Sequence, residues 1–62
     1  MEQTYSSRVD TIFSIYKETK TPMVKLLNMY QALTVGEKRT LLYLSGYDNF
    51  YEVTEDGKIK KK

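Results

Sequence analysis

The chain has 62 residues, of which 40% are hydrophobic, and carries a formal net charge of +2. A chain of this length forms one small domain of marginal stability, because it buries only about 60% of the surface that its unfolded form exposes. It contains neither cysteine nor histidine, which excludes disulfides and thiolate chemistry and removes the commonest metal ligand and general base. We therefore expect a non-enzymatic protein without catalytic residues, cofactor or metal site.

Two features of the sequence bear on its location in the cell. The longest apolar run is Leu41–Leu44, which is far shorter than a membrane span. The first residues lack the basic and then apolar layout of a secretory signal. We expect a cytoplasmic protein with no membrane partner.

The first segment has the spacing of an amphipathic helix. Its apolar residues recur at intervals of three and four and share one helical face: Tyr5, Val9, Ile12, Phe13 and Tyr16. Ser6 or Ser7 can cap the start, because a short hydroxyl side chain accepts from the free N–H groups of the first turn. Ser7 with Asp10 also resembles a capping box. We predict a helix at about residues 6–19.

A second helix start lies at Thr21-Pro22. Proline has no N–H to lose at the first helical position, and threonine is a fair cap before it. The apolar residues that follow again share one helical face: Met23, Leu26, Leu27, Tyr30 and Leu33. We predict a helix at about residues 22–33.

The third helix has the clearest boundaries. Thr34 and Glu37 form a capping box, in which the threonine hydroxyl accepts from the N–H of residue 37 and the carboxylate reaches back to residue 34. Gly46 can take the left-handed conformation that ends a helix. We predict a helix at about residues 35–45, joined to the second by the short turn that is typical of a helix-turn-helix.

Two short strands are predicted after the third helix. Residues 50–54 are rich in aromatic and β-branched side chains. Residues 55–57 read Glu-Asp-Gly and suit a three-residue hairpin loop, with positive φ at Gly57. We predict strands at about residues 50–54 and 58–61. We expect Phe50 to be buried, whereas the exposure of Tyr47 and Tyr51 stays open.

The cross-strand pairs that each loop length would produce indicate which loop length is favoured. A three-residue loop sets Val53 opposite Ile59 on one face and Glu52 opposite Lys60 on the other. A two-residue loop would put the two aliphatic side chains on opposite faces. The three-residue loop is favoured, because only then can both aliphatic residues pack against the helices.

Three helices and a hairpin, with the last two helices tightly joined, resemble the winged-helix fold. The likeness rests on PMVKLLNMYQAL (residues 22–33), TVGEKRTLLYLSGYDNFYEV (34–53) and the wing tip VTEDGKIKK (53–61). The predicted fold class is mainly α with a small β-hairpin, in one compact winged-helix-like domain over residues 1–62. The resemblance implies nucleic-acid binding through the third helix and the wing.

Carried over residue by residue, the resemblance supplies the candidate contacts. They are Lys38, Arg39, Thr40 and Tyr43 on the third helix and Lys58, Lys60 and Lys61 on the wing. Tyr43 and Tyr51 lie close to these cations in the sequence and are candidates for stacking on the bases of a single strand. We expect binding of single-stranded or weakly specific duplex DNA.

A different class of function stays open at this point. The lysines also fit a solvated terminus, and the aromatic residues also fit a core. The alternative is a protein-interaction adaptor or inhibitor that binds a polymerase, a nuclease or a regulator, or forms a homodimer. Its contact surface would consist of apolar residues that do not all fit inside a small body, drawn from Tyr5, Ile15, Met23 and Met29. The first helix, opposite the predicted wing, is the candidate for this surface.

Overall fold

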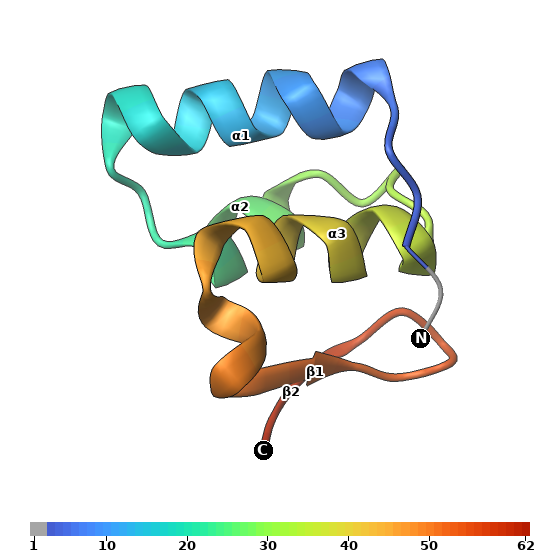
Figure 1. Cartoon of the computed structure of the whole chain (residues 1–62). Coiled ribbons are helices and arrows are strands. Elements are labelled where there is room, and N and C mark those ends of the chain that lie inside the picture. Colours follow the sequence, from blue (N-terminus) through green and yellow to red (C-terminus); the bar gives the residue numbers. More distant parts are fainter. Residues whose placement is uncertain (1–2) are drawn as a thin grey trace.

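The computed structural model describes residues 3–62. Within them the elements follow in the order α1 (Ser7–Thr19), α2 (Met23–Met29), α3 (Val35–Ser45), a 3-10 turn η1 (Tyr47–Asn49), β1 (Tyr51–Val53) and β2 (Ile59–Lys61). The three helices and the antiparallel hairpin of this described part confirm the predicted fold class, and their order is compatible with winged-helix topology. Helix α3 lies in the middle, between α1 and the hairpin (Figure 1).

Helix α1 agrees with the prediction to within one residue. Of the two candidate caps the structure selects Ser6, whose hydroxyl accepts a hydrogen bond from the N–H of Val9 at 3.3 Å. The proposed capping box of Ser7 and Asp10 is therefore wrong, because Ser7 is already inside the helix. Lys20 ends the helix in the left-handed conformation, with φ of 57°.

Helix α2 is shorter than predicted. It begins at Met23 and ends at Met29, so the predicted end at residue 33 is wrong. Pro22 is the N-cap residue and no side chain caps the helix, so the predicted roles of Thr21 as cap and Pro22 as first helical residue are wrong. The Thr21 hydroxyl pairs instead with that of Thr19 at 2.7 Å. Tyr30 leaves the helix with φ of −104° and ψ of 84°, yet Leu33 is still buried. The predicted helix was too long because Leu33, a buried loop residue, continues the helical spacing of the apolar residues.

Helix α3 has the predicted caps. The Thr34 hydroxyl accepts from the N–H of Glu37 at 3.2 Å, and the N–H of Thr34 donates to the Glu37 carboxylate at 2.9 Å. Gly46 ends the helix with φ of 80°. The short-range pattern at both ends was sufficient to place this helix.

The hairpin has the predicted register, in which Val53 pairs with Ile59 and Glu52 with Lys60. Gly57 has φ of 86°, as the three-residue loop requires. The ladder itself is shorter than predicted, with strands at Tyr51–Val53 and Ile59–Lys61.

The predicted burial of Phe50 is wrong, because 64% of its surface is exposed. Its place against the helices is taken by Tyr47 and Tyr51, which are half-buried and stack with ring centres 6.1 Å apart. Tyr16 of α1 meets the Tyr47 ring edge-on at 6.3 Å. Side chains alternate between the two faces of a strand. Since Tyr51 and Val53 face inward, Phe50, which precedes them, is left on the outer side.

Apolar side chains from all three helices, from the loop after α2 and from β1 form the core. They are Val9, Ile12, Met23, Leu26, Leu27, Leu33, Leu41, Leu42 and Val53. Ile15 is half-buried against this core, whereas Tyr5 and Met29 are exposed. Within residues 3–62, none of the helices has the length and apolar character that crossing a bilayer requires.

One charged side chain lies inside the structure. Glu37 is only 2% exposed, and its carboxylate accepts from the Ser6 hydroxyl at 2.5 Å and lies 3.4 Å from Nε of Arg8. The hydrogen bond from Ser6, followed by that from the N–H of Thr34, lowers the pKa of Glu37 against the opposing effect of burial. The carboxylate thus joins the first turn of α1 to the first turn of α3, where both helix dipoles favour a negative charge.

We expect Glu37→Gln to lower the free energy of unfolding by about 1–3 kcal/mol at neutral pH, because hydrogen bonds to a buried charge are lost. Since folding depresses the pKa of Glu37, this stabilisation is present above the ordinary carboxyl pKa and is lost as the pH falls through the lower folded value. Urea unfolding of the wild type and of Glu37→Gln, from neutral pH down to about pH 2, should therefore show a difference in the free energy of unfolding that becomes smaller in acid.

Glu18→Gln is the matched control, because it makes the same chemical change at an exposed position of α1. We expect it to change stability by less than about 0.5 kcal/mol. A gap for Glu37→Gln that stays constant in acid would contradict a role for the charge itself.

Candidate functional site

The two cations of α3 reach toward the hairpin. Nζ of Lys38 donates to the carbonyl of Gly57 at 2.6 Å, and Nη2 of Arg39 donates to the carbonyl of Val53 at 3.5 Å. Both side chains are half-buried. They fasten the hairpin to α3, so donors of both side chains are already engaged within the fold.

Thr40 is fully buried. Its hydroxyl donates to the carbonyl of Gly36 at 2.9 Å and accepts from the N–H of Thr4 at 2.9 Å. This residue holds the N-terminal segment against α3 and has no surface for a nucleic acid, so its prediction as a contact is wrong.

The two candidate tyrosines differ in exposure. Tyr43 is 54% exposed on α3, whereas Tyr51 is half-buried and packs on Tyr47. Together with Arg39 they line a hollow of about 240 Å³ between α3 and the hairpin, which Lys62 also borders. The structure brings these candidates together, but Asp48 and Glu52 line the same hollow and offset its positive charge.

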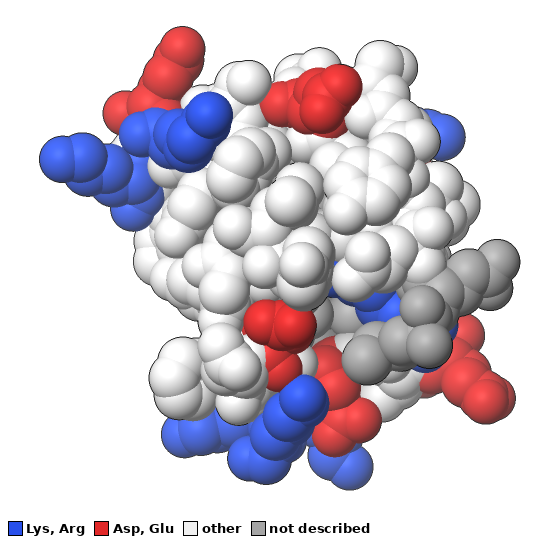
Figure 2. All heavy atoms as spheres, in the orientation of Figure 1, with Lys and Arg blue, Asp and Glu red and all other residues white. Residues whose placement is uncertain are grey.

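The lysines of the hairpin are all exposed, as their proposed role requires. Figure 2 shows basic side chains gathered over the hairpin, with acidic side chains beside them. At the tip, Lys58 lies 4.0 Å from the Asp56 carboxylate. The Thr54 hydroxyl, which donates to Asp56, lowers the pKa of Asp56, and the backbone N–H of Asp56 and then the charge of Lys58 add to this effect. The tip carries two acids, Glu55 and Asp56, against Lys58, so the positive excess of the hairpin lies at its end, at Lys60–Lys62.

The prediction missed an exposed aromatic ring at that same end. The carbonyl of Phe50 accepts a hydrogen bond from the N–H of Lys62 at 2.9 Å, which continues the register of the hairpin. The backbone of Phe50 therefore lies beside the end of the chain that carries Lys60, Lys61 and Lys62, and all four side chains are exposed. The register itself held the signal, because placing Val53 inward also placed Tyr51 inward and left Phe50 outside.

Residues 3–62 bring together no group of acidic side chains that could hold a metal ion. None of the family models, curated proteins or solved structures with which the chain was compared matches it. The candidate site therefore rests on its own geometry: an exposed ring, a run of lysines and a hairpin clamped to α3.

We expect Lys38→Met to loosen the hairpin, because it removes the charged donor on the Gly57 carbonyl and keeps the apolar stem. The loss of about 1 kcal/mol corresponds to roughly fivefold faster exchange of hairpin amides, read at Thr54 and Lys62. Lys25→Met, at an exposed position of α2, is the control and should leave these amides unchanged. Equal exchange in the two variants would contradict the clamp.

Proposed function

We propose that the protein binds single-stranded nucleic acid without catalysis and does so through the hairpin rather than through α3. The observation that carries the proposal is the exposed ring of Phe50, whose backbone is hydrogen-bonded to the lysine-rich end of β2. A large exposed aromatic side chain next to several cations is the combination from which single-strand binding surfaces are built.

The preference for single strands follows from what an exposed aromatic ring can contact and from the hydrogen bonds that Lys38 and Arg39 already make. An aromatic side chain stacks on the face of a base, and that face is accessible only where the bases are unpaired. Reading a duplex in the major groove would require donors on α3. Lys38 and Arg39 instead donate to carbonyls of the hairpin, which favours the hairpin as the binding surface.

The charge of the hairpin favours moderate, sequence-tolerant binding. Residues 50–62 contain Lys58, Lys60, Lys61 and Lys62 against Glu52, Glu55 and Asp56. Each phosphate that a lysine neutralises contributes a slope of about −0.7 to the dependence of log affinity on log salt concentration. A few such contacts give a measurable but shallow dependence on salt.

We expect Phe50→Ala to weaken the binding of a labelled oligothymidylate by about 1–3 kcal/mol while leaving its salt dependence unchanged, because stacking carries no charge. Lys60→Gln combined with Lys62→Gln should flatten the salt slope by about 1.4, since each lost phosphate contact contributes about 0.7. Fluorescence anisotropy at several salt concentrations measures both effects.

Matched controls exist for both changes. Tyr5→Ala removes a ring that is as exposed as Phe50 but lies in the N-terminal segment, and Lys17→Gln with Lys25→Gln removes the same charge from α1 and α2. Neither should alter the affinity beyond about twofold. Unchanged binding in Phe50→Ala, or equally tight binding of a matched duplex, would contradict the proposal.

A further inference from the structure

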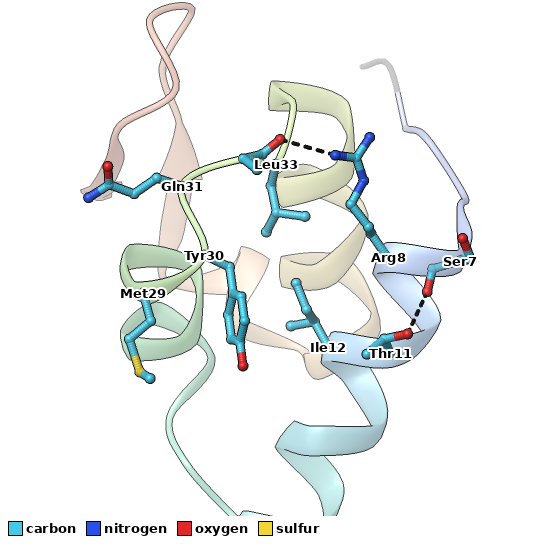
Figure 3. A pocket seen from close by; sticks show the side chains of 9 residues that line it. Ser7, Arg8, Thr11, Ile12, Met29, Tyr30, Gln31 and Leu33 are labelled. Atoms are coloured by element: carbon cyan, nitrogen blue, oxygen red, sulfur yellow. Dashed lines mark hydrogen bonds between the residues drawn. The ribbon is translucent and has the colours of Figure 1, made fainter.

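A second surface lies between the start of α1 and the end of α2. It is a hollow of about 420 Å³, and none of the described residues that line it belongs to the hairpin. Ile12 of α1 and two residues that follow α2, Tyr30 and Leu33, converge on it, and Arg8 lies at one end (Figure 3). Its size falls within the range of pockets that accept a ligand or a side chain of a partner.

The early end of α2 creates this hollow. Because the chain leaves the helix after Met29, Met29 and Tyr30 stay at the rim, and Met29 is 62% exposed. Leu33 turns back and is buried with Ile12 beneath them. Large apolar side chains around a concave apolar floor are unfavourable in water, so covering them is favourable.

Charge decides what kind of group can cover it. Among residues 3–62, Arg8 is the only charged residue that lines the hollow. Its guanidinium is held from two sides, since Nη1 donates to the carbonyl of Ala32 at 3.5 Å and Nε lies 3.4 Å from the Glu37 carboxylate. Arg8 is 59% exposed whereas Glu37 is buried, so the surface presents the cation.

The contacts of Arg8 leave part of its hydrogen-bonding capacity for a partner. A guanidinium has five N–H donors in a planar fork, and the two internal contacts use only some of them. Because those contacts fix the plane of the group, a carboxylate that docks on the remaining donors orders little additional chain. An apolar hollow with one fixed cation at its end is complementary to an apolar group that carries a nearby acid.

We propose that this hollow binds a segment of another protein, which places one large apolar side chain over Ile12 and Leu33 and the carboxylate of an aspartate or glutamate against Arg8. The site is independent of the hairpin, so a nucleic acid and this segment can be bound together. The partner chemistry is acidic and apolar, in contrast to the phosphate chemistry proposed for the hairpin.

Selection of random linear peptides against the immobilised protein tests the proposal. We expect the enriched peptides to share a large aliphatic or aromatic residue with an aspartate or glutamate within one helical turn of it. A consensus without an acid, a consensus rich in lysine and arginine, or the absence of any enriched family would overturn the proposal.

Two substitutions of opposite charge at Thr11 then test whether the peptide binds in the hollow, and they leave Arg8 unchanged. Thr11 is exposed and lines the hollow, so both Thr11→Glu and Thr11→Lys should fold. We expect a selected peptide, blocked at both ends, to bind Thr11→Lys about tenfold more tightly than Thr11→Glu. Phe50→Ala is the control on the hairpin and should bind the peptide like the wild type.

Equal affinity of the two Thr11 variants would place the peptide elsewhere and overturn the proposal. Sedimentation of the wild-type protein tests the other occupant, a second copy of the chain. A dimer that is lost in Thr11→Glu would mean that the protein itself covers the hollow, which also overturns the proposal, whereas a monomer supports it.

Discussion

The carboxylate of Glu37 is the contact on which the arrangement of the helices depends. It accepts from Thr34 within the cap of α3 and from Ser6, the residue that caps α1. A buried charge is costly unless it is fully hydrogen-bonded; these donors, together with Arg8, satisfy it. The start of α1 is thereby held to the start of α3, and the hollow beside Arg8 and the core beneath it follow from that placement.

The cations of α3 have a comparable structural role on the opposite side of the helix. Lys38 and Arg39 hold the hairpin through its carbonyl groups, and Val53 closes the core from the same direction. Because these cations already bind the hairpin, the surfaces that we propose for partners are the outer end of the hairpin and the hollow between α1 and α2. One helix thus supports both proposed surfaces without forming the main part of either.

The sequence predicted best what depends on neighbours within a few positions. The Thr34–Glu37 box, the left-handed Gly46 and Gly57 and the hairpin register are all of this kind, and all are confirmed. Where α2 ends and where the Phe50 ring lies depend on which side chains occupy the core, and that is decided by distant elements. The same holds for the site: the exposure of the hairpin lysines followed from their positions, whereas the partners of Lys38 and Arg39 on the hairpin, and the N–H of Thr4 that meets Thr40, lie across the fold and carry no local signal.

The serine hydroxyl at the start of α1 also bears on how the chain folds. The contact between Thr34 and Glu37 spans three positions, whereas that between Ser6 and Glu37 spans 31. The first can form in an isolated helical turn, while the second must first close a long loop, at an entropic cost that grows with the logarithm of its length. An interaction that forms after the rate-limiting step governs unfolding more than folding. A hydrogen bond between Ser6 and Glu37 that forms after that step would slow the unfolding of the domain without speeding its folding.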